Sequence, residues 1–276
     1  MRKTVSKSLI LFAFLSSAAF ASNALEQSAV GKNASKDWSV SLKNTITTNM
    51  YDLDSVNHYA TNETRFDVNI KVDDATYGLY TILGKELQGE RDQSLSDINF
   101  KFIKKFMDIG EHVTLTHYPI IKLPTSEDTD KRANLQVQAT YILYTTIKGS
   151  LVGNENFSFA ILPYVTKAFH EYTTTTLGKS NTEWTLSFNP SAEYAFSDSF
   201  ALGLEFGYTR GFTYRGNSKD AYAFGTYLSF DFLEDSNATL GYDIGGAPLA
   251  ANGRDTRVNI IDNREANLYL ELSTKF

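Results

Sequence analysis

The sequence predicts an all-β protein, a transmembrane up-and-down antiparallel β-barrel of about twelve strands. Three observations lead to this prediction. Apolar and polar residues alternate along nearly the whole chain from Trp38 to its end, and aromatic residues recur at the ends of the alternating segments. The chain has no cysteine, so a small disulfide-bonded fold is excluded. A helix cannot sort side chains with a period of two, so the segments are strands.

The alternation is clearest in the second half of the chain. One face of the segment that begins at Phe200 is apolar and the other is small or polar, and the last segment, ending at Phe276, repeats the pattern. Two segments, about 77 to 87 and 113 to 123, resemble strands without a clear apolar face. The apolar faces persist for about ten residues, whereas soluble strands usually run for about five or six, and this length matches a tilted crossing of a bilayer.

The connections between the segments are of two kinds, and the two kinds alternate. Tight polar turns alternate with longer connections, which is the order expected when a barrel has short turns at one membrane face and long loops at the other. Both ends of the barrel segment should then lie on the short-turn side. The tight turns are expected at 73–76, 108–111, 197–199 and 234–237. The longer connections are expected near 52–63, 88–96, 124–133, 169–182, 210–221 and 245–264. One connection, 148–156, is longer than the scheme predicts.

The beginning of the chain has the pattern of a secretory signal. Arg2, Lys3 and Lys7 precede an uncharged apolar run that ends in the small-residue triplet at Ala19 to Ala21. The run is shorter than the ~20 residues that a membrane-spanning helix needs. The sequence therefore predicts a signal peptide at 1–21, a polar N-terminal leader at 22–36 and the barrel at 37–276.

Composition and charge exclude several function classes. The formal net charge is -6, and removal of the basic signal makes the mature chain more acidic still, so nucleic acid is not an expected partner. The absence of cysteine excludes thiolate metal sites and cysteine nucleophiles. The histidines, His58, His112, His117 and His170, do not share a strand face in pairs, so no metal site, catalytic set or cofactor is expected.

The signal pattern, the alternation and the final amphipathic strand ending in Phe276 resemble the outer-membrane β-barrel proteins of Gram-negative bacteria. The resemblance implies a place in the cell outer membrane, contact with its lipid and lipopolysaccharide, and recognition of the C-terminal strand by the barrel assembly machinery. Thr274, where that family prefers a larger apolar residue, is a departure. An outer-membrane phospholipase of this architecture presents a serine two residues from a histidine, but Tyr172 holds that position after His170.

The faces opposite the apolar ones should line the interior of the barrel, and their charges are segregated along the sequence. Basic residues dominate the early strands and acidic residues the late ones, so that the two groups should occupy different arcs of the wall. The pore-lining candidates are Lys43, Arg65, Asp67, Lys71, Lys101, Lys105, Glu193, Glu205, Asp231, Asp243, Glu265 and Glu271.

These features predict a porin-like channel for passive diffusion of small hydrophilic solutes, without enzyme activity. A barrel of about twelve strands is intermediate between filled and wide barrels, and inward glycines such as Gly203, Gly207 and Gly225 are expected to leave room for water. The alternative is a barrel whose interior charges pair and fill it, which does not conduct and has a structural or adhesive role. An outer-membrane hydrolase is a further alternative, but no catalytic set supports it.

Arginines gather near the expected outer ends of the last strands. Their positions suit attraction of anionic solutes, and equally well binding of lipopolysaccharide phosphates or of loop carboxylates. They are Arg210, Arg215, Arg254, Arg257 and Arg264.

Overall fold

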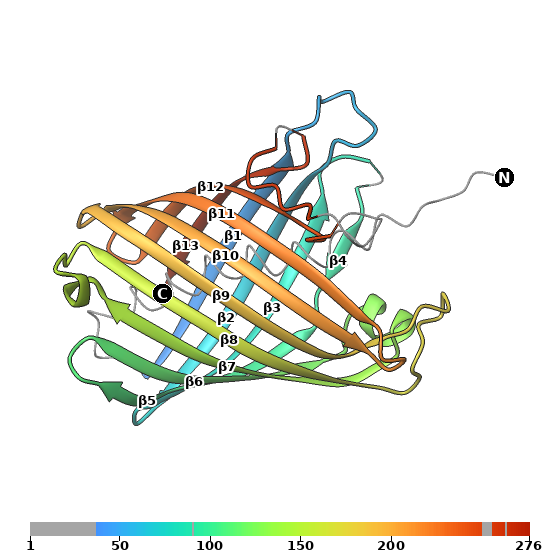
Figure 1. Ribbon diagram of the computed structural model, residues 1–276, viewed down its shortest axis with the longest axis horizontal. Coiled ribbons are helices and arrows are strands. Elements are labelled where there is room, and N and C mark those ends of the chain that lie inside the picture. Colours follow the sequence, from blue (N-terminus) through green and yellow to red (C-terminus); the bar gives the residue numbers. More distant parts are fainter. Residues whose placement is uncertain (1–36, 90, 250–255, 263) are drawn as a thin grey trace.

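The computed structural model describes residues 37–89, 91–249, 256–262 and 264–276, which form one closed antiparallel barrel (Figure 1). The predicted fold class is confirmed, with 12 strands in the wall. The signal peptide and leader predicted for residues 1–36 lie outside the described residues. The strands are β1 (Trp38–Asn49), β2 (Ala60–Val72), β3 (Ala75–Glu86), the short β4 (Gln93–Leu95), β5 (Ile98–Ile109), β6 (Val113–Leu123), β7 (Leu135–Lys148), β8 (Phe157–His170), β9 (Thr182–Ser197), β10 (Phe200–Thr213), β11 (Ser218–Leu233), β12 (Ser236–Gly246) and β13 (Asn267–Lys275).

Pairing of the first strand with the last closes the barrel. Strand β1 pairs with β13 from Ser41↔Lys275 to Asn49↔Asn267, and pairs with β2 on its other side. Strand β3 pairs with β5 over Ala75–Tyr80, and β4 pairs with Leu83–Lys85 of β3. Each wall strand therefore has a partner on both sides, as a sheet in lipid requires.

The two ends of the barrel differ in the length of their connections. At one end, here called the short-turn end, β1 begins, β13 ends, and tight turns such as 73–74 and 198–199 join the strands. The longer connection expected there contains a 3₁₀ helix, Gly149–Val152, which ends at Gly153 with φ 78°. The opposite end, the long-loop end, carries connections such as 50–59 and 247–266.

One expected loop is wrong. Residues 210–221 do not form a long connection, because β10 continues to Thr213 and β11 begins at Ser218, leaving only 214–217 between them. A turn with Gly216 at φ 76° joins the two strands. The pairs Arg210↔Asp220 and Gly211↔Lys219 extend this hairpin into the region read as loop. The segments 77–87 and 113–123, which lacked a clear apolar face, are strands β3 and β6.

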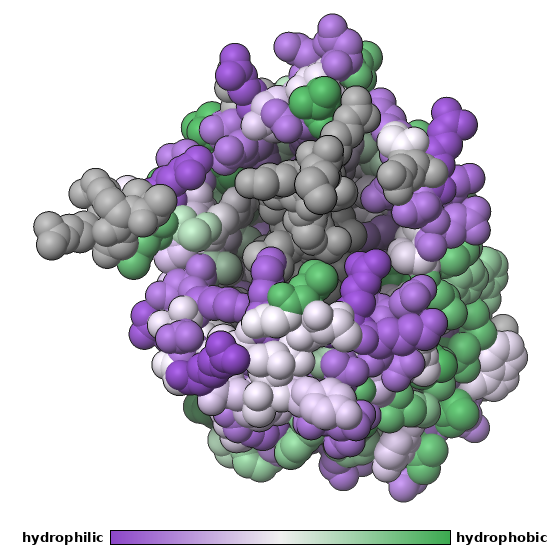
Figure 2. Space-filling view, turned by 90° about the vertical axis from the view of Figure 1, so that its right-hand side faces the viewer, coloured by the Kyte–Doolittle hydropathy of each residue, from purple (hydrophilic) through white to green (hydrophobic). Residues whose placement is uncertain are grey.

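Large hydrophobic side chains cover the outer surface of the wall. Figure 2 looks at the long-loop end, where hydrophilic residues gather, and shows hydrophobic residues on the flank of the barrel at its lower right. Aromatic side chains lie near the strand ends, as expected for the two interfaces of a bilayer. Exposed examples along the wall are Trp38, Phe66, Val68, Tyr77, Phe100, Phe106, Trp184, Phe188, Phe200, Leu204, Phe230, Leu240, Leu270 and Phe276.

Polar side chains interrupt this apolar surface on β1 and β2. The Asn44 amide nitrogen donates to Asn62 Oδ1 at 2.9 Å and to Thr64 Oγ1 at 2.8 Å. By the alternation these side chains share the outer face with Ile46 and Phe66. Their mutual hydrogen bonds reduce the cost of placing amides against hydrocarbon. In the part of the chain that is described, no helix has the length and apolar character to cross a membrane.

Cysteine labelling tests which end of the barrel faces outward. Ser218 lies exposed at the long-loop end and Ser197 at the short-turn end, and the chain has no cysteine of its own. In intact cells an impermeant thiol reagent should label Ser218→Cys but not Ser197→Cys. It should label Ser197→Cys only after the outer membrane is permeabilised. The reverse order would show that the topology is inverted.

Arginine substitutions on the two faces of the wall test which side chains face outward. Leu204 is 48% exposed on the outer face, so Leu204→Arg should cost ~2–4 kcal/mol of stability in a bilayer. Ser191, on the inner face and paired with Glu205, supplies the control, because Ser191→Arg meets a carboxylate there. Unfolding in lipid vesicles measures both. Gly203→Arg does not serve as the control, because the ring of Tyr227 occupies the space over Gly203. Equal destabilisation by the two arginines would contradict the assignment.

Candidate functional site

The inner face of the barrel carries the buried polar and charged side chains. Asp67 is 3% exposed, Lys101 4%, Asp243 5% and Glu271 3%. The alternation of each strand sends these side chains inward while their neighbours cover the outer surface. The inner wall is therefore the candidate functional site.

The structure brings most of the sequence-predicted pore-lining residues to this wall. Lys71, Lys105 and Asp231 are exposed toward the short-turn end of their strands. Glu265 precedes β13, is exposed, and lies 3.6 Å from Arg257 in an ion pair. The candidates that lie on the inner face along the strands are Lys43, Arg65, Asp67, Lys101, Glu193, Glu205, Asp243 and Glu271.

A compact group on β2, β3 and β5 holds the basic side chains. Arg65 Nε lies 2.6 Å from Asp67 Oδ2, and Lys101 Nζ lies 2.7 Å from Asp67 Oδ1. The Arg65 guanidinium stacks over the Tyr80 ring, with Cζ 4.0 Å from the ring centroid. Among the described residues, one buried carboxylate thus joins two cations.

A second ion pair spans the closure of the barrel. Lys43 Nζ of β1 lies 3.5 Å from Glu271 Oε2 of β13. The Thr45 hydroxyl donates to the same carboxylate oxygen at 3.1 Å. These contacts place a basic and an acidic side chain directly at the joint between the first and the last strand.

Three further carboxylates lie on the inner face of β9, β10 and β12. Asp243 accepts a hydrogen bond from the Asn267 amide at 2.8 Å, and Glu193 accepts one from the Tyr227 hydroxyl at 2.9 Å. Glu205 lies against Gly225. Among the described residues, none of these three carboxylates is in an ion pair. Among the described residues, inward basic side chains thus lie on β1, β2 and β5, and inward carboxylates without an ion-pair partner lie on β9, β10 and β12.

The inward glycines receive side chains from neighbouring strands. A Cβ on Gly203 would lie 2.0 Å from Cζ of Tyr227, and one on Gly241 would lie 2.1 Å from Cζ of Tyr269. The register pairs Gly203 with both Glu193 and Tyr227, so the tyrosine crosses the glycine to reach the glutamate. The inward glycines were expected to leave space for water. The structure instead places large side chains over them, against the wall.

The inner wall also has an apolar part that was not predicted from the sequence. Buried side chains of β6, β7 and β8 form it, and the strand order places β6 and β7 across the barrel from β12 and β13. Their inward positions could have been found by extending the alternation from the outer residues of β7, but apolar residues stand on both faces there. The cluster consists of Tyr118, Ile142, Tyr144, Ala160 and Leu162.

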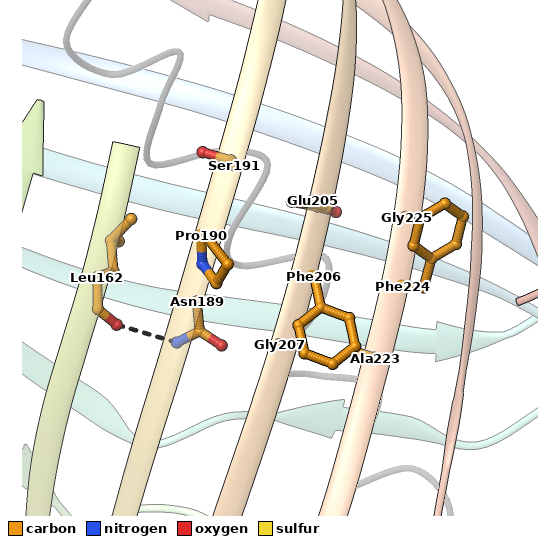
Figure 3. A pocket seen from close by; sticks show the side chains of 10 residues that line it. All are labelled: Leu162, Asn189, Pro190, Ser191, Glu205, Phe206, Gly207, Ala223, Phe224 and Gly225. Carbon is orange, nitrogen blue, oxygen red and sulfur yellow. Dashed lines mark hydrogen bonds between the residues drawn. The ribbon is translucent and has the colours of Figure 1, made fainter. Parts of the chain in front are cut away.

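A hollow in the wall joins the apolar stretch to the acidic one. Leu162 and Glu205 line the same hollow, together with Gly207 and Gly225 (Figure 3). The Asn189 amide donates to the Leu162 carbonyl at 3.2 Å, the dashed line of Figure 3, and so fixes its own side chain on the wall. The hollow therefore offers an apolar and an anionic surface together.

The arginines near the long-loop end are partly neutralised. Arg210 Nε lies 2.7 Å from Asp220 Oδ1, and Arg257 pairs with Glu265. Arg254 lies outside the described residues. The paired carboxylates reduce the positive charge that these side chains could offer to phosphates. Among the described residues, no group of three or more His, Cys, Asp or Glu is placed to hold a metal ion.

A double-mutant cycle tests the contact of Tyr227 with Gly203. Gly203→Ala should destabilise the barrel by ~1–3 kcal/mol, because the added methyl meets the ring. In a Tyr227→Ala background the same change should cost much less. Urea unfolding in detergent measures the coupling, with Ala201→Ser at the preceding inward position as the control. Additive effects of the two changes would rule out the contact.

Comparison with known proteins gives structural likeness without sequence likeness. No protein-family model and no curated protein sequence matches the chain. An outer membrane channel from Pseudomonas putida F1 has a TM-score of 0.62 at 10% identity, over 90% of this chain and 100% of that one. The NanC porin has a TM-score of 0.53 at 11% identity, over 86% of this chain and 100% of its own. The chain therefore has the closed antiparallel β-barrel fold of these outer-membrane channels, with an apolar outer surface.

Proposed function

We propose that the barrel is a channel for passive diffusion of small hydrophilic solutes across the outer membrane. The observation that carries the proposal is the flat arrangement of large inward side chains. Tyr227 and Tyr269 lie over glycines of the neighbouring strands instead of pointing toward the barrel axis. The paired charges of the wall, such as Arg65 with Asp67, hold further long side chains against it.

The charges of the wall support a weak preference for cations. Lys43, Arg65 and Lys101 are outnumbered by the inward carboxylates, and most of the basic charge is in ion pairs. Carboxylates without an ion-pair partner among the described residues attract cations. Dissolved salt limits the range of this attraction to ~8 Å at physiological ionic strength. Selectivity should accordingly fall as salt rises.

Binding to outer-membrane lipid and lipopolysaccharide and binding to the barrel assembly machinery remain predictions. The outer surface suits outer-membrane lipid, and binding of lipopolysaccharide at the long-loop end rests on arginines that are partly paired. Recognition by the barrel assembly machinery rests on the last strand. The Phe276 side chain at its end is 63% exposed, and its backbone bonds to that of Val40.

A non-conducting structural or adhesive barrel is the second candidate. The observation that favours it is the ion-paired bracing of the wall by Asp67, which joins two strands as a filled interior would require. Conductance separates the two candidates. No arrangement of residues described above supports a hydrolase.

Recordings in planar bilayers test the proposal. The purified, folded protein should conduct potassium chloride, and Glu193→Gln together with Glu205→Gln should shift the reversal potential toward anions, because both side chains face inward without a cationic partner among the described residues. Glu234→Gln, in an exposed turn at the short-turn end, is the matched control and should change it little. Absence of conductance above the bare bilayer would reject the channel in favour of the second candidate.

A further inference from the structure

We propose that the inner wall binds solutes that combine an ammonium group with an apolar body, at a site formed by Glu205, Asp243, Glu271 and Tyr269. This inference deepens the proposed function, on which it rests, by naming a class of preferred solute. Two independent features carry it: a cluster of carboxylates short of positive charge, and a buried hydroxyl without a partner beside them.

The carboxylates lie on neighbouring strands of the wall. Glu205 lies against Gly225, and the register pairs Gly225 with Asp243, while Glu271 lies on β13 beside β12. Lys43 is already 3.5 Å from Glu271, while Asp243 has the neutral Asn267 amide as its partner. Like charges gathered on a partly enclosed wall repel one another, so a cation entering the cluster is stabilised there.

The Tyr269 side chain lies on the same part of the wall. Its register partner Gly241 stands two residues before Asp243, and Glu271 follows Tyr269 by two residues on β13. The side chain is 3% exposed, and its oxygen has no hydrogen-bond partner among the described residues. Because the ring lies over Gly241, the hydroxyl is held in place. A buried hydroxyl without a partner is unfavourable, and a ligand that donates a hydrogen bond would satisfy it.

An ammonium group fits this set better than a metal ion. The described residues hold no group of three or more ligating side chains arranged for a metal. A primary ammonium carries three N–H donors that point in separate directions. Carboxylates spread over Glu205 and Asp243, with the Tyr269 oxygen as a further acceptor, can receive these donors one by one.

The apolar part of the solute follows from the hollow beside Glu205. Leu162 lines this hollow together with Glu205 and the backbone of Gly225 (Figure 3). Leu162 also belongs to the buried apolar cluster of β6–β8. A solute held by its ammonium at the acidic cluster therefore places an adjoining apolar group against Leu162, where burial of apolar surface adds to binding.

Block of the potassium current by matched probes tests the site. Benzylammonium should block the purified full-length protein more strongly than methylammonium, which lacks the apolar body, or benzyl alcohol, which lacks the charge. Glu205→Gln with Asp243→Asn should weaken the benzylammonium block about tenfold. Leu162→Asn should weaken it while leaving the methylammonium block unchanged, and Glu234→Gln is the control. Tyr269→Phe, which removes only the hydroxyl, should also weaken the block, and circular dichroism checks the fold of each variant.

The outcomes separate this inference from the proposed function. Equal block by the three probes, or block that persists in the Glu205→Gln and Asp243→Asn variant, would overturn the site while leaving the channel intact. If the protein does not conduct, the channel fails, and calorimetric titration of the same probes into the purified barrel decides the site by itself. Binding of benzylammonium that depends on Glu205 would then support the site, and absence of binding would overturn it.

Discussion

The pairing of β1 with β13 is the constraint on which the rest of the structure depends. In hydrocarbon every backbone N–H and C=O needs a partner within the protein, and an open sheet edge would leave a row of them exposed. Residues far apart in the chain, such as Thr45 and Glu271, meet in this pairing. Their hydrogen bond shows that the joint is made by side chains as well as by the backbone. The register of this joint sets which side chains of β1 and β13 face inward.

Closure divides the inner wall into arcs of different chemistry. Basic side chains bound to Asp67 occupy β2 and β5, and an apolar cluster occupies β6 to β8. Carboxylates on β9, β10 and β12 form a third arc. The basic side chains of the first arc are in ion pairs, whereas Glu193, Glu205 and Asp243 have no ion-pair partner among the described residues. The wall is therefore amphipathic rather than simply bipolar, and a solute with both a cationic and an apolar part matches it better than a simple ion.

The outer surface and the strand count could be predicted from the sequence because both depend on local alternation. Leu204 and Phe206 face outward as their spacing requires. The interior was predicted less well, because its contacts depend on register between strands. Lys101 reaches Asp67 only because β2, β3 and β5 align as they do, and Tyr227 covers Gly203 only because the two residues are paired. The hairpin at 214–217 was read as a long loop because its polar residues continue the strands beyond the apolar surface.

The most direct test of the account is chemical modification of adjacent residues on opposite faces of one strand. Ser191 pairs with Glu205 on the inner face, and Ala192 pairs with Leu204 on the outer face. In a chain without other cysteines, a water-soluble, positively charged thiol reagent should modify Ser191→Cys during a single-channel recording and lower its conductance in a discrete step. The same reagent should leave the current through Ala192→Cys unchanged. An unmodified cysteine at 191, or an equal loss of current from both variants, would contradict a water-filled path along the inner wall.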